Sequence, residues 1–437
     1  MVIYIKRIAL ALLALIFIAL ISIYFSLRAS LPQLDGETTL KGLSNNTTIE
    51  RDANGTVTIN AQTETDSMRA LGYVHAQERY FEMDLLRRSA SGELSALFGK
   101  IAIEKDKSIR VHRLRARIQN NYVQMVGSEA DNLVAYSEGV NAGLRALKTK
   151  PWPYLLLNTT PEAWKPEDTF LVGFAMFFDL QDEDNEREYK LWQLRNILPA
   201  PIYTLLTQSH SAWDAPLFGE AKHRVVIPTA EQINLNTYTA PQLAFQPNKL
   251  SEAVGSNNFA VSGALTADGR AIVADDMHLG LRAPNIWFRA RLLTGKNSDV
   301  SGFSLPGIPS IIVGSNRHVA WGFTNSYGDW ADFVRVQWLD AKQTKYLDQT
   351  GSEQTVKVFD ELIQVKGQQP VSFEVRETVW GPITKTINSS FALALQWSAQ
   401  QSGSLNIGLT QLARSRDLDQ ALLTAHSIGI PGQNLVI

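Results

Sequence analysis

The stretch Val254-Gly255-Ser256-Asn257-Asn258-Phe259-Ala260-Val261 joins two parts of the chain that differ in character. The residues before it are rich in charged side chains and in patterns typical of helices. The residues after it alternate in the manner of β-strands and are rich in Gly, Asn and Trp. A Gly-Ser pair that leads into alternating apolar residues is usually an ordinary turn before a strand. The pair nevertheless lies where the helical pattern changes to the strand pattern, and this position makes Ser256 a candidate catalytic residue.

The composition is that of an ordinary globular protein. The chain has 437 residues, of which 45% are hydrophobic and 19% charged, and its formal net charge is -2. Because there is no excess of basic residues, we expect no nucleic-acid partner. The chain contains no cysteine, which excludes disulfides, a thiol nucleophile and thiolate metal ligands.

The N-terminus contains an uncharged apolar run, residues 8–27, flanked by Lys6-Arg7 and Arg28. Twenty such residues are enough to cross a bilayer core of ~30 Å as a helix. The positive flank predicts that the N-terminus stays in the cytoplasm and that the body is exported. A cleaved signal peptide is the alternative, but residues 27–29 (LRA) lack the small-residue pattern of a cleavage site. We therefore expect residues 1–29 to anchor a periplasmic body to the inner membrane.

Periodicity divides the rest of the chain into a helical part and a strand-rich part. The Asn54-Gly55 pair between two β-rich runs predicts a hairpin over residues 47–59, and residues 64–100, 101–150 and 167–197 have helical patterns. Helix N-capping is expected at residues 65–67 and a C-cap at Gly99. Residues 241–252 resemble an exposed connector. Strands are predicted after it, at 258–262, 271–274, 287–293, 311–313 and 331–338, with short helices at 409–414 and 418–427. Periodicity alone therefore predicts an α+β fold.

Several short motifs follow one another along both parts of the chain. They are residues 72–79 (GYVHAQER), 83–88 (MDLLRR), 92–94 (GEL), 255–258 (GSNN), 276–279 (DMHL), 321–325 (WGFTN) and 431–434 (PGQN). Together they resemble the penicillin acylase family of N-terminal nucleophile (Ntn) hydrolases. Phe259 departs from the Trp that often follows the Ser-Asn-Asn motif, but it keeps an aromatic ring.

The resemblance implies a precursor, or zymogen, that cuts itself before Ser256 to give an α/β heterodimer with an αββα sandwich as its core. The α chain would come from residues 30–240, residues 241–255 would form a spacer, and the β chain would begin in residues 256–437. Family members continue well beyond the position of Asn434, so we expect this last region to be only the N-terminal part of the β chain.

The resemblance also assigns catalytic roles. Ser256 is the expected nucleophile, and its freed α-amino group is the expected base, since such amines have pKa values of roughly 7.7–8.0. The backbone N–H of Asn325 and the side-chain amide of Asn434 are the expected oxyanion donors. His278 is expected near the amine of Ser256, although a buried capping histidine is the structural alternative. A Ser256–His278–Asp triad is not expected, because the family motif makes the amine the base.

Two further sites come from the same resemblance. Asp329, Asp332 and the carbonyl of Ala331 match a structural Ca²⁺ loop, to which Glu188 would add a ligand from the acidic run 182–188. Glu183 and Glu186 are alternatives to Glu188. Phe177 matches an aromatic residue of the family's acyl pocket, and Met176 stands where some members have an Arg, so the resemblance implies an apolar acyl pocket.

The expected activity is hydrolysis of the amide bond of small N-acyl compounds. Arylacetyl amides such as penicillin G, which would link the chain to antibiotic metabolism, and N-acyl-homoserine lactones are the candidate substrates. The alternative is a membrane-anchored, unprocessed protein that binds a ligand or has lost its activity.

Overall fold

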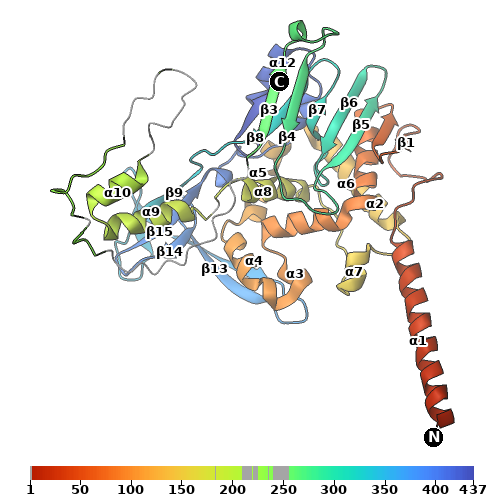
Figure 1. Ribbon diagram of the computed structural model, residues 1–437, viewed down its shortest axis with the longest axis horizontal. Helices are drawn as coiled ribbons and strands as arrows, with labels where there is room; N and C mark the ends of the chain where they lie inside the picture. Colours follow the sequence, from red (N-terminus) through yellow and green to blue (C-terminus); the bar gives the residue numbers. More distant parts are fainter. Residues whose placement is uncertain (1, 183, 209–218, 220–224, 235, 240–254) are drawn as a thin grey trace.

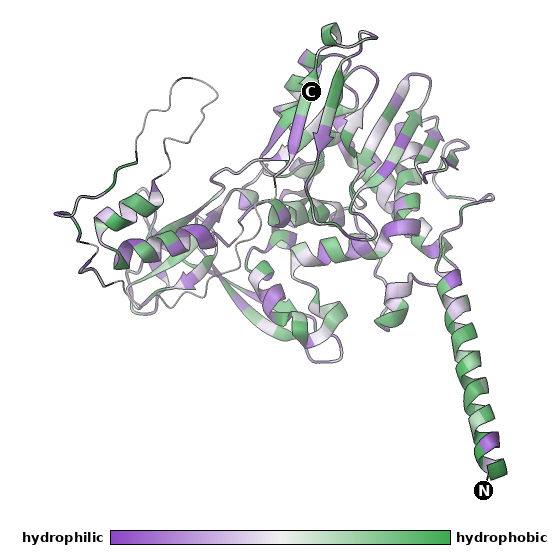
Figure 2. Ribbon diagram, viewed as in Figure 1, coloured by the Kyte–Doolittle hydropathy of each residue, from purple (hydrophilic) through white to green (hydrophobic). Residues whose placement is uncertain are grey.

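The computed structural model describes residues 2–182, 184–208, 219, 225–234, 236–239 and 255–437. The predicted spacer therefore lies outside the described residues except for Gly255, as does Glu183. Helix α1 (Val2–Ala29) extends away from the body and buries none of its side chains (Figure 1). Figure 2 shows that its surface is apolar along almost its whole length. By length and composition it is sufficient to cross a membrane.

A seven-stranded sheet joins the two parts of the chain. The predicted hairpin is confirmed, because β1 (Thr48–Arg51) and β2 (Val57–Ala61) pair antiparallel around Asn54-Gly55. Strand β2 then pairs in parallel with β5, and the remaining strands pair antiparallel. The order is β1-β2-β5-β6-β7-β8-β16. Its other strands are β5 (Phe288–Thr294), β6 (Ser298–Ser304), β7 (Ile311–Ser315), β8 (Ala320–Asn325) and β16 (Gln433–Val436).

Helices α2 (Glu64–Ser91), α6 (Ala130–Ala146) and α8 (Asp168–Leu180) form the helical core. Helices α2 and α6 approach so closely that a Cβ at Gly72 would lie 2.2 Å from the carbonyl oxygen of Tyr136. His75 of α2 contacts the hydroxyls of Tyr136 at 2.8 Å and Ser304 at 3.0 Å, and so joins α2, α6 and β6. Burial lowers its pKa to about 3, which keeps the ring neutral. His75 is therefore a structural residue.

The other helices of the described part are short. They are α3 (Ser95–Phe98), α4 (Ile103–Arg110), α5 (Leu114–Val126), α7 (Trp152–Leu156), α9 (Glu186–Ile197), α10 (Ala200–Thr207), α11 (Leu409–Leu412) and α12 (Leu418–Ala425), with 3-10 turns at Gly99–Ala102, Gly127–Glu129, Gly263–Leu265 and Ser398–Gln400. The predicted N-cap was wrong, because Thr63, not residues 65–67, caps α2. The predicted C-cap is confirmed: α2 ends at Gly92, where φ is +65°, and the second helix of this region, α3, ends at Gly99.

The remaining strands form smaller sheets. Strands β9, β15 and β14 make a three-stranded sheet beside α9, and three hairpins complete the set. Their bounds are β3 (Asn257–Val261), β4 (Ile272–Asp276), β9 (Ala331–Gln337), β10 (Lys345–Leu347), β11 (Glu353–Thr355), β12 (Lys357–Ile363), β13 (Val371–Glu377), β14 (Ile383–Thr386) and β15 (Phe391–Trp397). The mixed α and β content agrees with the predicted fold class. The complete αββα sandwich and the chain boundaries stay predictions.

Candidate active site

Ser256 lies at the start of the β3–β4 hairpin. Strand β3 begins at Asn257, which pairs with Asp276, the last residue of β4. This register brings Ser256 beside the residues that leave β4, and its hydroxyl oxygen accepts a hydrogen bond from the backbone N–H of His278 at 3.2 Å. Gly255 is exposed, and no atom lies within 4 Å of where its Cβ would stand. The bond between Gly255 and Ser256 is thus on the surface, at the end of a fixed strand.

The ring of His278 contacts Asp276 rather than Ser256. Its Nε2 lies 2.7 Å from a carboxylate oxygen of Asp276, and more than a third of the side chain is exposed. The structure therefore brings His278 next to Ser256, the predicted nucleophile, but through its main chain. The alternative of a buried histidine does not hold.

Asn325 and Asn434 come from neighbouring antiparallel strands, β8 and β16. The amide of Asn434 donates to the hydroxyl of Thr324 at 3.3 Å and to the carbonyl of Asn325 at 3.4 Å. Both bonds are long, so they are weak, and the amide can turn toward another acceptor at little cost. The side chain of Asn325 instead donates to the carbonyl of Leu180 at the end of α8. It therefore joins β8 to α8.

A cavity of about 110 Å³ opens beside Ser256. Ser256 and Asn325 line it together with Met176 of α8. Met277 and Leu279, from the loop after β4, line it as well. Most of the other lining side chains are apolar as well. A cleft of this kind, apolar with a few convergent polar groups, is typical of a small-molecule site.

Phe177 does not line this cavity, although the sequence predicted it there. It is buried in a separate cluster, where its ring lies 5.6 Å from that of Phe174 and 6.1 Å from that of Trp397. Adjacent side chains on a helix point about 100° apart, and here Met176 is partly exposed toward the cavity whereas Phe177 is buried. Met176 is the member of the predicted pair that faces it.

Asp275 is a residue that the sequence analysis missed. It lies on β4 directly over Gly322 of β8, where a Cβ would come within 2.8 Å of the Asp275 side chain. Both of its carboxylate oxygens are buried without a well-oriented hydrogen-bond partner among the described residues. Burial raises its pKa to about 6; the N–H of Phe323 opposes this shift, and the charge of Asp276 adds to it. Strand alternation could have revealed that this member of the Asp275-Asp276 pair faces inward.

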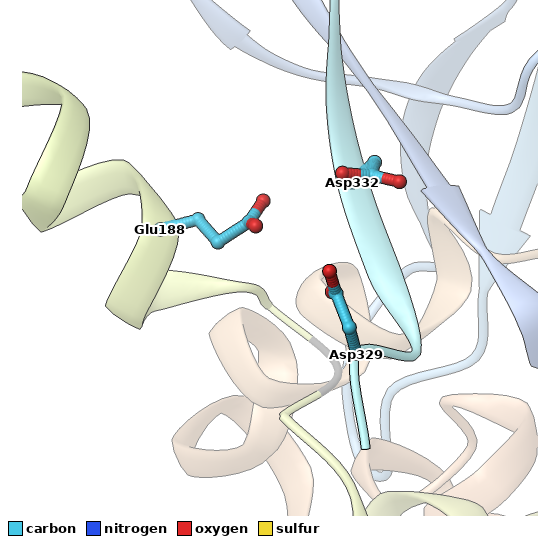
Figure 3. A group of neighbouring side chains, drawn as sticks. All are labelled: Glu188, Asp329 and Asp332. Carbon is cyan, nitrogen blue, oxygen red and sulfur yellow. The ribbon is translucent and has the colours of Figure 1, made fainter. Parts of the chain in front are cut away.

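Three carboxylates converge where α9 meets β9 (Figure 3). Glu188 from α9 points toward Asp329 and Asp332, and one oxygen from each lies within 4.8 Å of the others. Like charges at this separation repel one another, and a shared divalent cation would remove the repulsion. Oxygen donors of this type suit Ca²⁺.

The contacts around this cluster distinguish the predicted ligands that lie close to it from the one that does not. Glu186 forms an ion pair with Lys385 at 2.6 Å and does not belong to the group of three carboxylates. The carbonyl of Ala331 accepts a hydrogen bond from the amide of Asn185 at 2.9 Å, and the same amide lies 2.6 Å from Glu188. Asn185 therefore holds Glu188 and Ala331 together. The carbonyl oxygen of Ala331 has a second lone pair, so it can accept this bond and still offer a ligand atom to a cation.

Comparison with known proteins gives one consistent family. A family model described as penicillin amidase matches residues 46–437. The chain is 28% identical over 422 residues to acyl-homoserine lactone acylase QuiP of Pseudomonas aeruginosa, a match that covers 93% of this chain and 50% of the relative. It is 31% identical over 375 residues to penicillin acylase 2 proenzyme of Pseudomonas sp. (82% and 46%), and 26% identical over 410 residues to penicillin G acylase of Escherichia coli (82% and 48%).

The chain spans about half the length of the curated relatives that it matches. Among solved structures, a thermostable penicillin G acylase from Alcaligenes faecalis matches with a TM-score of 0.36 and 21% identity. That alignment covers 40% of this chain and 32% of the other. The fold described above therefore rests on the elements of this chain alone.

Proposed function

The chain belongs to the penicillin amidase family, and on this premise we propose that it hydrolyses the amide bond of N-acyl compounds with Ser256 as an N-terminal nucleophile. The observation that carries the proposal is that Ser256 and Asn325 line one apolar cavity. An acyl group in this cavity would bring its carbonyl carbon beside the hydroxyl of Ser256.

The proposed reaction begins with cleavage of the Gly255–Ser256 bond, which frees the α-amino group of Ser256. An unperturbed α-amine has a pKa of roughly 7.7–8.0, so a useful fraction is neutral and able to accept a proton. The hydroxyl of Ser256 then attacks the amide carbon while its proton passes to the amine, directly or through a water. The leaving amine takes up a proton and departs, and water hydrolyses the acyl ester.

The negative oxygen of the tetrahedral intermediate needs donors that are already in position. The side-chain amide of Asn434 is one proposed donor, because its two present hydrogen bonds are long. The backbone N–H of Asn325 is the other. The bond from the Asn325 side chain to Leu180 supports this role, since it fixes the end of β8 against α8.

The apolar lining favours substrates with an apolar acyl group, whether aryl or aliphatic. Met176, Met277 and Leu279 offer no charge to bind a polar acyl end. Arylacetyl amides of the penicillin type and N-acyl-homoserine lactones both meet this requirement, and relatives named for each activity are similar to the chain. Acyl specificity is therefore a question for a substrate panel.

A structural calcium ion is part of the proposal. Glu188, Asp329 and Asp332 would hold it, and it would supply a cross-link rather than catalysis. Glu188 precedes the proposed cleavage site and the two aspartates follow it, so the ion would join the two chains after processing. We also propose that α1 holds the body in the periplasm.

N-terminal sequencing of the expressed protein on a denaturing gel tests the proposal. We expect two chains, one of which begins at Ser256, and release of amine from phenylacetyl amides or acyl-homoserine lactones. Ser256→Ala should give one uncut, inactive chain. Ser262→Ala is a matched control, because Ser262 only caps a turn at the end of β3. An uncut wild-type chain that releases no amine would favour the alternative of an unprocessed binding protein.

A further inference from the structure

The segment that follows α1 is fixed to the body. Ser30 is buried, and the backbone N–H of Gln33 donates to the side chain of Gln77 at 2.9 Å. The amide of Gln77 donates in turn to the carbonyl of Gly143 at 2.7 Å, so α2 and α6 both hold this junction. The point where α1 leaves the body is therefore held by a hydrogen bond to α2 that a buried bond connects to α6.

Helix α7 lies beside that point. A cleft of about 360 Å³ has Ser30 and Leu31 on its wall together with Trp152 and Pro153 of α7. In Figure 1, α7 projects from the side of the body toward which α1 extends. The two helices are thus neighbours at one end of the molecule.

Two large apolar side chains of α7 face outward. Trp152 is 53% exposed and Leu156 is 78% exposed, and residues four apart lie on the same helical face. Tyr154 between them is fully buried, and its hydroxyl donates to Asp84 of α2. This buried bond fixes α7, so the outward direction of Trp152 and Leu156 does not depend on a flexible loop. Leu31, which is 61% exposed, continues the apolar surface across the cleft.

We propose that Leu31, Trp152 and Leu156 form a second membrane contact, here called the juxtamembrane patch, that inserts into the outer interface of the bilayer that α1 spans. A helix of 28 residues is about 42 Å long, which exceeds a hydrocarbon core of ~30 Å. The end of α1 therefore emerges in the headgroup layer, and side chains beside it lie at the same depth. Tryptophan is enriched at this depth because its ring is both apolar and able to donate a hydrogen bond.

This contact would orient the enzyme, not only tether it. One helix alone leaves the body free to tilt about the point where α1 enters it. A second contact beside the junction fixes the face that the body turns to the lipid. The proposal rests on α1 as an anchor and does not depend on the acylase activity.

The absence of cysteine makes a direct test possible. Leu156→Cys is labelled with an environment-sensitive dye in the full chain, reconstituted into vesicles of phosphatidylethanolamine and phosphatidylglycerol. Leu423→Cys is the matched control, since Leu423 is 73% exposed on α12, which lies away from α1 at the top of Figure 1. We expect a blue-shifted emission and loss of most of it to lipid-borne quenchers for the dye at position 156 only.

The outcomes separate the possible occupants of the patch. Flotation with the vesicles checks the anchor, and a chain that does not float would overturn the proposal at its premise. A chain that floats but shows as little quenching at position 156 as at position 423 would overturn the proposal, because the patch would then stay in water. A blue shift at position 156 that depends on protein concentration and resists lipid quenchers would mean that a second copy covers the patch.

Discussion

The backbone N–H of His278 donates to the hydroxyl of Ser256, while the ring of His278 turns to Asp276. The two residues are thus joined through the main chain, and this bond does not depend on the side chain at position 278. This arrangement supports the α-amine of Ser256, rather than the imidazole, as the base.

We therefore expect His278→Ala to retain activity within about tenfold of the wild type. A general base typically contributes 10²–10⁴-fold, so a loss of that size would mean that the ring takes the proton. The measurement is kcat/KM for amine release as a function of pH. If the α-amine is the base, the acidic limb of the profile should persist in the variant.

Much of this site could be predicted from the sequence because its residues lie in short motifs of fixed register. Ser256 directly precedes a strand, and the motifs around Asn325 and Asn434 lie on paired strands. Glu188 was chosen from an acidic run, and the structure brings it to Asp329 and Asp332. In each case the resemblance of these motifs to a family supplied the assignment, because local sequence alone does not show which distant segments the fold brings together.

The errors arose where packing between elements decides the outcome. Met176 and Phe177 are adjacent apolar residues of one helix, and only the rotation of α8 against the sheet determines which faces the cavity. Asp275 was missed for the same reason, since its burial depends on how closely the β3–β4 hairpin approaches Gly322. Strands β6 and β8 were not predicted, because both are interrupted by glycine and have little clear alternation.

Asn434→Ala should reduce kcat by roughly 10²–10³-fold, the usual effect of losing one oxyanion donor. KM should change little, because the donor acts on the charge that develops in the transition state. Asn325→Ala is the comparison. It removes the bond to Leu180 and should cost about 1 kcal/mol of stability, with a smaller effect on kcat because the backbone donates. Equal losses of kcat in the two variants would contradict separate roles.

Asp275 should make the stability of the hairpin depend on pH. Its pKa is raised to about 6, so between about pH 4 and pH 6 the folded state holds a proton that the unfolded state has released. The free energy of unfolding should therefore fall as the pH rises through this window. Asp275→Asn has nearly the same shape but no charge, and the variant should be more stable than the wild type above pH 6. Urea midpoints at a series of pH values measure the difference, which would be constant if Asp275 titrated normally.

We predict that calcium stabilises the protein through the carboxylate cluster and that this stabilisation depends on Glu188. Ligand binding at 100 times its Kd stabilises a protein by about 2.7 kcal/mol, so calcium should raise the Tm of the wild type and chelation should lower it. Glu188→Gln should remove most of this shift, since it deletes a charged ligand. Glu186→Gln is the matched control, because Glu186 pairs with Lys385, and a partly exposed pair contributes about 1 kcal/mol at most. The control should lose a little stability but keep the calcium shift. A shift that is the same in both variants, or equally large with magnesium, would show that this cluster does not hold the ion.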